Sequence, residues 1–293
     1  MPSLDDLNKR IKSVKSTQKI TKAMKMVAAA KLRKAQENAE KGRPYSQKMQ
    51  NIILNLTKSI KDQENAPKLL IGTGEDKTHL CVVLTADRGL CGGFNSNICK
   101  LAKNNFKKIL NEGKNLKIIT VGSKGLDQIK REYGKYIINK LSFKDKKQIT
   151  FGEAEIVGSE IIKLFNLGEF DKCILFYNNF KNVITQIPQA QQIIPTENKS
   201  SNELEDEPLH SYEFEPDEDE ILEDLLPKNI STQVFKAFLE NAASEQGSRM
   251  TAMDNATRNA GDLVDKLTIN YNRSRQASIT KELIEIISGA ESL

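Results

Sequence analysis

The stretch MDNATRNAGDLVDKL, residues 253–267, has apolar side chains spaced alternately by three and four residues. These positions are Met253, Ala256, Ala260, Leu263 and Leu267. Two such positions per heptad are typical of the seam of a coiled coil, whereas a helix on a broad core has a wider apolar face. The stretch therefore predicts a long helix that pairs with a second helix.

A matching segment lies at the start of the chain. Ser3 is a suitable N-cap, and the residues after it repeat the spacing of three, four and three with Leu4, Leu7, Ile11 and Val14. Proline is absent from residues 3–43 and from residues 228–293, and we expect Pro44 to interrupt or kink the first helix. A helix of about 60 residues would be about 90 Å long, too long to be buried in a small domain. The two helices are therefore expected to form one antiparallel pair.

The middle of the chain has a different pattern. Strands are expected at 79–86, 117–121, 172–177 and 183–187, and helices at 97–110, 125–133 and 153–167. This alternation is typical of an α/β sheet covered on both faces. The predicted fold is a long antiparallel coiled coil of the terminal helices with an inserted Rossmann-like α/β domain. The predicted boundaries are a shaft helix at 1–62, the α/β domain at 75–196, an acidic linker and foot segment at 197–226, and a second shaft helix at 227–293.

Charge is segregated along the 293 residues. Residues 1–61 hold 15 Lys and Arg against 4 Asp and Glu, a net of +11, and residues 197–224 hold 13 acids and one lysine, a net of −12. Residues 228–293 hold eight of each. Three charge regimes suggest three structural roles. The sequence contains no run of about 18 apolar residues, so no membrane span is expected.

The four cysteines and two histidines do not predict a metal or catalytic site. No CxxC pair occurs, and the cysteines are expected to be reduced and partly buried. His79 and His210 are far apart in sequence, and His79 is expected at the edge of a strand.

A glycine-rich loop, TADRGLCGGFN at 85–95, follows the first expected strand. Doubly wound folds bind phosphate at this position, but the glycines form neither GxGxxG nor a Walker loop, and the second strand is followed by Gly122-Ser-Lys124 instead of an acid. A tight strand-to-helix turn is therefore favoured over nucleotide binding. We expect Asp87 and Arg88 to pair in it, and Cys91 to be an inert thiol because no histidine lies nearby in sequence.

Several stretches resemble the gamma subunit family of F-type ATP synthases. They are IKSVKSTQKITKAMKMVAAAK at 11–31, LTADRGLCGGFN at 84–95, ASEQGSRMTAMDNAT at 243–257 and NRSRQASITKELIEIISGA at 272–290. The chain resembles the bacterial and mitochondrial branch, since the cysteine-bearing insertion of the chloroplast branch has no counterpart here.

The resemblance implies a function. The terminal helices would form a rotating central shaft inside a ring of three alpha and three beta subunits, with its foot on the membrane ring of c subunits and near epsilon. Proton flow would turn the shaft and drive conformational change in the catalytic beta subunits. The chain itself would perform no chemistry and need no cofactor or metal, and it would lie peripherally on the cytoplasmic face of a bacterial inner membrane.

The resemblance also assigns contact residues. By their local motifs, the contacts to an acidic loop of beta would be Met24, Lys25, Arg249, Arg275, Gln276 and Thr280. In the foot, Tyr212, Phe214 and Glu215 would lie near the c ring or epsilon.

Two other classes of function remain open from the residues alone. The net charge of +11 over residues 1–61 also suits a basic coiled coil with an α/β head that binds nucleic acid, although no aromatic residue lies between Lys9 and Lys34. An enzyme that uses the glycine-rich loop is the other alternative.

Overall fold

The structure, a computed structural model, describes residues 3–59, 67–146, 148–196 and 218–291. It divides into two compact units. Unit 1 comprises residues 1–30 and 249–293, and unit 2 comprises residues 31–248. Two long helices, α1 (Leu4–Ser59) and α6 (Glu218–Glu291), each contribute to both units.

The ends of the long helices differ in part from the expectation. Ser3 caps α1 as predicted, because its Oγ accepts the N–H of Asp6 at 3.1 Å. However, α1 continues through Pro44, and α6 begins at Glu218, inside the segment assigned to the acidic linker. In unit 2 the first turns of α6 bury Leu222 and Leu226 in a cluster with Met49, Ile53 and Leu70. This packing outweighs the local effect of Pro227, which lies inside the helix.

Unit 1 is an antiparallel helix pair whose register is defined by three contacts. Lys25 Nζ lies 2.5 Å from Asp254 Oδ1, and Thr257 Oγ1 donates to Thr21 Oγ1 at 2.7 Å. A Cβ on Gly261 would lie 3.1 Å from Gln18 Nε2. Numbers rise along α1 while they fall along α6, which confirms the predicted antiparallel pairing within this unit.

The phase of the seam on α6 corrects two positions of the prediction, because Thr257 and Val264 take the places expected for Ala256 and Leu263. Val264 is 8% exposed, whereas Leu263 is 46% exposed, so Val264 occupies the seam in place of Leu263. The buried positions of this stretch are Met253, Ala260 and Val264. With Thr257, which pairs with Thr21, and half-buried Leu267, they are again at alternating spacings of four and three. The reason is geometric: the pairing of Thr257 with Thr21 sets a phase that turns Leu263 outward despite its larger apolar side chain.

Unit 2 contains a five-stranded sheet in the order β3-β2-β1-β4-β5. Within this sheet β3, β2, β1 and β4 are parallel to one another, and the edge strand β5 is antiparallel to β4. The strands are β1 (Thr78–Leu84), β2 (Asn115–Val121), β3 (Ile137–Leu141), β4 (Lys172–Phe180) and β5 (Gln186–Ile194). The helices of this unit besides the long ones are α2 (Lys68–Ile71), α3 (Phe94–Asn111), α4 (Ser123–Tyr133) and α5 (Phe151–Asn166), with a 3₁₀ turn at Gly134–Tyr136.

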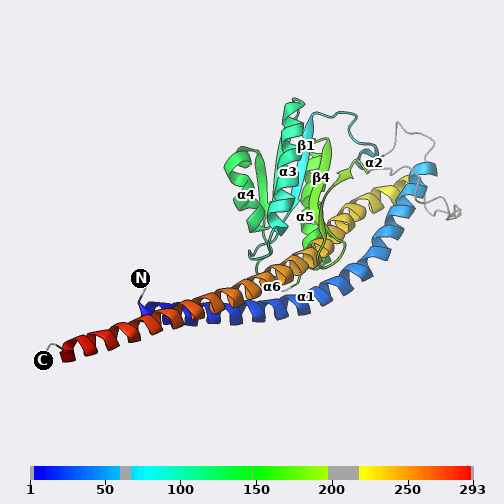
Figure 1. The fold of residues 1–293 in the computed structure, drawn as a ribbon. Helices are drawn as coiled ribbons and strands as arrows, with labels where there is room; N and C mark the ends of the chain where they lie inside the picture. The colour runs from blue at the N-terminus through cyan, green and yellow to red at the C-terminus, as the bar shows by residue number, and fades with distance from the viewer. Residues whose placement is uncertain (1–2, 60–66, 147, 197–217, 292–293) are drawn as a thin grey trace. The chain divides into compact units, whose positions relative to one another are not determined.

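The sheet is covered on both faces, as the sequence predicts. Alternate residues of β1 point to opposite sides: Leu80 and Val82 pack in a core with α5 and α6, and Cys81 and Val83 pack with α3 and α4. The C-terminal long helix is therefore itself one of the layers of the α/β domain in unit 2 (Figure 1).

Two strands depart from the prediction. Strand β3 was not predicted, because it is a short edge strand in which half-buried and exposed residues alternate. The fourth predicted strand, 183–187, overlaps β5 only at Gln186 and Ile187. Strand β5 is rich in glutamine, which has no strong preference for strands, and its pairing with β4 determines its position.

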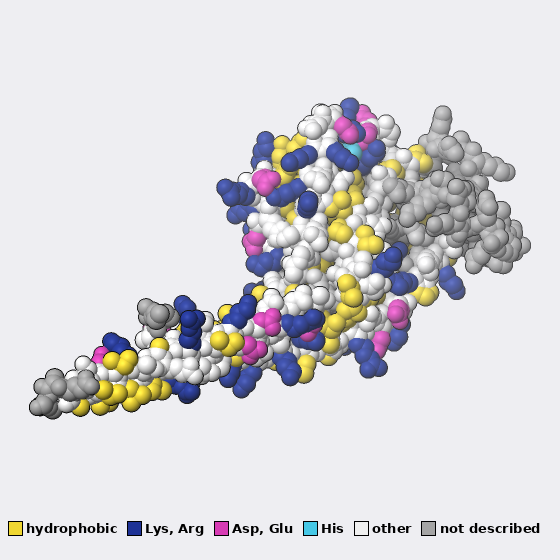
Figure 2. Space-filling model, in the orientation of Figure 1, with side chains coloured by type: hydrophobic (Ala, Val, Ile, Leu, Met, Phe, Trp, Pro, Cys, Tyr) yellow, Lys and Arg dark blue, Asp and Glu magenta, His cyan; other side chains and the backbone are white. Residues whose placement is uncertain are grey.

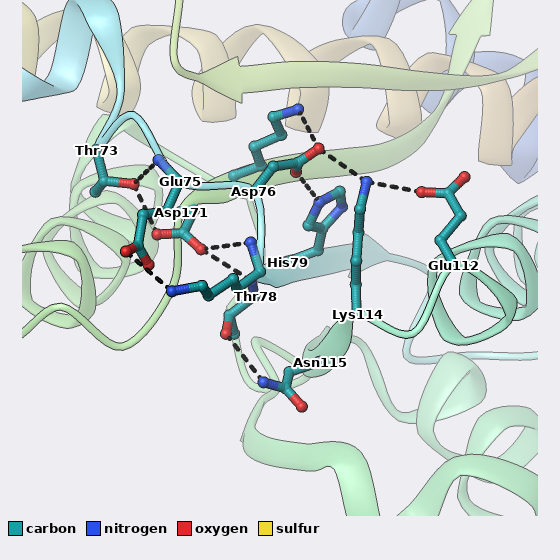
Figure 3. Close-up of polar contacts among 11 residues, drawn as sticks. Thr73, Glu75, Asp76, Thr78, His79, Glu112, Lys114, Asn115 and Asp171 are labelled. Atoms are coloured by element: carbon teal, nitrogen blue, oxygen red, sulfur yellow. Dashed lines mark hydrogen bonds and ion pairs between the residues drawn. The ribbon is translucent and has the colours of Figure 1, made fainter.

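A polar cluster fixes the amino ends of the parallel strands (Figure 3). The carboxylate of Asp76 lies 2.5 Å from His79 Nε2, 2.8 Å from Lys114 Nζ and 3.0 Å from Lys172 Nζ. Burial opposes ionisation of Asp76, but the hydrogen bonds from these three partners outweigh it and hold the pKa of Asp76 well below its ordinary value. The cluster therefore ties β1 to the start of β2 and β4, and His79 is buried in it at the beginning of β1.

All four cysteines are free and buried, as expected. Burial raises the pKa of the Cys99 thiol to about 11. Cys81 and Cys173 lie on neighbouring strands but belong to opposite faces of the sheet.

Candidate coupling site

The glycine-rich loop lies at the carboxyl end of β1 and is held by its own polar contacts. Asp87 accepts hydrogen bonds from Ser123 N at 2.9 Å, Ser142 Oγ at 2.7 Å and Phe143 N at 3.2 Å. The expected Asp87–Arg88 pair is therefore wrong, because the carboxylate caps α4 and holds the segment after β3. Cys91 is buried, and its Sγ accepts from Asn95 Nδ2 at 3.2 Å, which agrees with the prediction of an inert thiol.

Helix α6 occupies the position at which a doubly wound fold binds its ligand. The strand order reverses between β1 and β4, and the carboxyl ends of those two strands mark that position. Three side chains of α6 bind there: Asn241 Nδ2 donates to Leu84 O at 3.3 Å, Ser244 Oγ donates to Asn178 O at 3.2 Å, and Ser248 Oγ donates to Cys91 O at 2.6 Å. The loop thus attaches the α/β domain to α6.

We expect no tight ATP site on this chain. The ligand position of the fold is filled by α6, and the loop lacks a phosphate-binding pattern. Calorimetric titration of the full chain with magnesium-ATP should give no saturating heat. A saturable micromolar site would contradict this expectation and would support the enzyme alternative.

Two of the predicted coupling residues lie together on α1 in unit 1. Met24 is half-buried, and its neighbour Lys25 forms an ion pair with Asp254, which also binds Arg258. Hydrogen bonds from Lys25 and Arg258 hold the pKa of Asp254 below its ordinary value. Lys25 is therefore held within the helix pair by its ion pair with Asp254.

The four coupling residues on α6 fall into two groups. Arg249 is half-buried at the start of the unit 1 part of α6. Arg275 and Gln276 are exposed, and Thr280 Oγ1 donates to Gln276 O at 2.9 Å. At 1.5 Å per residue, Arg249 and Arg275 are separated by roughly 39 Å along the helix. A single loop of a partner would not span both groups.

The structure shows exposed apolar residues near Met24 that the family motifs do not assign as contacts. Ile20, Met26 and Val27 are all more than half exposed on α1, beside Met24. A heptad pattern can reveal such residues, because Ile20 and Val27 are apolar at positions outside the seam that runs through Thr21 and Ala28.

A second exposed apolar stretch lies near the end of α6 in unit 1. Figure 2 shows hydrophobic side chains along this end of the helix. Its members are Ile279, Leu283, Ile284, Ile286 and Ile287. The register of the helix pair places Gln18 beside Gly261, so this stretch extends past the start of α1. Such a surface is typical of a contact with another protein.

The predicted foot residues, Tyr212, Phe214 and Glu215, lie outside the described residues. Within the described ranges, no group of three His, Cys, Asp or Glu side chains is arranged to hold a metal ion. Nor does any helix of the described part combine the length and hydrophobicity needed to cross a membrane.

Comparison with known proteins identifies the family. The ATP synthase family profile matches residues 3–293. The chain is 74% identical to the ATP synthase gamma chain of Pelagibacter ubique and 56% identical to that of Rhizobium etli, in each case over 100% of both chains. Nothing in these comparisons supports the nucleic-acid alternative.

Solved structures agree in fold. A chain from the central stalk and c-ring of the Tetrahymena thermophila mitochondrial ATP synthase matches with a TM-score of 0.59 and 27% identity, over 81% of this chain and 99% of that one. A chain from the Euglena gracilis mitochondrial ATP synthase matches with a TM-score of 0.65 and 20% identity, over 99% and 94%. With its two long helices around an α/β domain and its full-length sequence match, the chain belongs to the family of ATP synthase gamma chains.

Proposed function

We propose that this chain is the central rotor shaft of an F-type ATP synthase and performs no catalysis itself. The observation that carries the proposal is the full-length match to ATP synthase gamma chains, on a fold whose two longest helices run from one unit into the other. The filled ligand position of the α/β domain supports a mechanical role, since α6 binds where a doubly wound enzyme would hold its nucleotide.

The partners are three alpha and three beta subunits around the shaft, with epsilon and the c ring at the foot. The exposed apolar end of α6 fits an apolar sleeve formed by alpha and beta, because it would otherwise leave several isoleucine and leucine side chains in water. The foot contacts would come from Tyr212, Phe214 and Glu215. The bacterial relatives favour a peripheral location on the cytoplasmic face of an inner membrane.

The contacts that turn with the shaft should be individually weak. Exposed ion pairs contribute about 0.2–1 kcal/mol each, so they can break and reform during rotation. Arg249 with Met24 and Lys25 would meet one part of the surrounding ring. Arg275, Gln276 and Thr280 would meet another, nearer the end of α6.

The assignment is tested by affinity purification. We expect the tagged full chain, co-expressed with the alpha and beta subunits of the same organism, to purify with an alpha/beta hexamer in a ratio of one to one. Deletion of residues 279–293 provides a matched variant, which should weaken this association without unfolding unit 2. Recovery of the chain without alpha and beta would contradict the rotor assignment.

The variant Met24→Lys is expected to uncouple hydrolysis from pumping. It adds a cation where the shaft would pass an acidic loop of beta, and even about 1.4 kcal/mol of extra attraction would lengthen one rotational dwell roughly tenfold. The complex should still assemble and hydrolyse ATP, but pump fewer protons per ATP in membrane vesicles. Ala23→Lys adds the same charge one residue away on the exposed surface of α1 and is the control. Equal pumping-to-hydrolysis ratios in Met24→Lys and wild type would remove Met24 from the coupling residues.

A further inference from the structure

A buried carboxylate joins three elements of unit 2. Glu240 of α6 has a side chain only 5% exposed. Its Oε1 accepts from Arg43 Nε of α1 at 2.9 Å, and its Oε2 accepts from the backbone N–H of Phe180 at the end of β4 at 3.1 Å. Arg43 Nη2 also donates to the Phe180 carbonyl at 3.5 Å. We call Glu240, Arg43 and the Phe180 backbone the Glu240 clasp.

At the clasp, the seam of α1 has a run of small side chains, which lies between buried Leu32 on one side and buried Met49 and Ile53 on the other. Its positions with the seam spacing of three and four are Ala35, Ala39, Gly42 and Ser46. The helices approach closely here, since a Cβ on Gly42 would lie 2.9 Å from Leu239 Cδ1. Small side chains bury little area and resemble one another, so at these four positions a shift by one helical turn would exchange similar contacts.

The clasp discriminates between such registers more strongly than it stabilises the fold. Moving a carboxylate out of water is unfavourable, and the ion pair and hydrogen bonds offset this cost only in the native arrangement. After a slip of one turn, Glu240 would remain buried while Arg43 moved about 5 Å along the helix axis. The slipped state would then contain a buried charge without its partner, which is the costly case.

We propose that Glu240 is a positioning residue that sets the register of α1 against α6. This inference goes beyond the rotor assignment, because it concerns the pairing of two helices within one chain. Its consequence for coupling, however, rests on the proposed function. A shaft with two coexisting registers would present its coupling residues at two different heights.

The register can be read from two pairs of engineered cysteines in unit 1. Thr21→Cys with Thr257→Cys reports the native register, because the two hydroxyl oxygens are 2.7 Å apart. Thr21→Cys with Gly261→Cys reports a slip of one turn, because Gly261 lies four residues farther along α6. Helices α1 and α6 each run without interruption from the clasp to these positions, so the proposal expects a slip at the clasp to change the link that forms. The native cysteines are all buried.

The experiment oxidises the full chain with each pair and quantifies the linked peptides by mass spectrometry. With Glu240 present, we expect the native link almost alone. With Glu240→Gln, which keeps the shape and removes the charge, the ratio of native to slipped link should fall about tenfold, which corresponds to about 1.4 kcal/mol. Glu37→Gln is the matched control, because Glu37 pairs with Arg33 on the exposed surface of α1.

If Glu240→Gln does not fold, Arg43→Gln tests the same proposal. Arg43 is 41% exposed, so Arg43→Gln leaves the core intact but removes the partner that offsets the buried carboxylate in the native register. The ratio should again fall. An unchanged ratio in whichever of these variants folds overturns the proposal, as does an equal fall in Glu37→Gln.

The outcome is independent of the rotor assignment. The cross-linking ratio is measured on the full chain without alpha or beta, whereas the rotor assignment depends on purification with their hexamer. Loss of the native link in Glu240→Gln together with failure to purify with alpha and beta would reject the rotor and retain the clasp. Normal assembly with an unchanged ratio would retain the rotor assignment and reject the role of the clasp.

Discussion

Replacing Val264 with aspartate is expected to separate the two helices of unit 1, while the same change at Leu263 leaves them paired. Val264 is a buried apolar residue of a seam that also contains the polar residues Gln18, Thr21 and Lys25. Aspartate there would lose apolar burial and place an unpaired charge between the helices, at a cost on the order of 3–5 kcal/mol. Leu263 is 46% exposed, so its replacement leaves the new carboxylate in water.

Hydrogen exchange of the full chain measures this difference. In Val264→Asp, amides of residues 250–270 should lose protection, whereas Leu263→Asp should exchange as wild type does. Amides of the sheet in unit 2 provide an internal reference, because neither residue belongs to that unit. Greater loss of protection in Leu263→Asp than in Val264→Asp would show that the seam has the other phase.

Replacing Gly122 with alanine is expected to prevent the α/β domain from folding. Gly122 has φ +98°, and a Cβ there would lie 2.2 Å from the carbonyl oxygen of Thr85. That oxygen belongs to backbone that cannot rotate away, since Thr85 N–H donates to Val121 O at 2.8 Å. The overlap therefore requires movement of β1 or β2, and we expect a loss of more than about 4 kcal/mol, in the exceptional range for a point substitution.

Gly113→Ala separates this overlap from the cost of backbone strain. Gly113 also has a positive φ, +73°, but no atom lies within 4 Å of the position of its Cβ. Its replacement should cost only about 1–2 kcal/mol of left-handed strain. Thermal unfolding followed by circular dichroism should show a shift of a few degrees for Gly113→Ala and no cooperative α/β transition for Gly122→Ala. Equal melting temperatures would contradict the role assigned to the Thr85 contact.

The strands show which structural features local sequence can predict. Strands β1, β2 and β4 are buried on both faces and are near-continuous apolar runs, so they were predicted within a few residues. Edge strands β3 and β5 have weaker apolar patterns, and their extended conformation depends on the strands they pair with. The same reason explains why Pro227 lies inside α6: the cluster with Met49 and Ile53 forms only in the folded chain.

In the candidate coupling site, too, some features follow from the sequence and others only from the tertiary structure. Motif resemblance predicts contacts at Met24 and Arg275, but it does not separate residues that would meet different parts of a partner. Only helix geometry shows that Arg249 and Arg275 are far apart and that Lys25 is held by Asp254. The exposed apolar residues beside Met24 are recognised only by reference to the seam, and the seam predicted for this helix from the sequence ends at Val14.

The sequence by itself determined the class of this fold and the family to which it belongs. Heptad spacing predicts a helix pair, alternating apolar runs predict an α/β sheet, and neither needs knowledge of distant contacts. The phase of the seam, the filling of the ligand position by α6 and the burial of Glu240 were decided by the tertiary structure. Each depends on residues more than a hundred positions apart, such as Thr21 with Thr257 or Arg43 with Glu240. Local patterns fix how each segment folds, but the free energy that chooses between registers comes from contacts that form only when those segments meet.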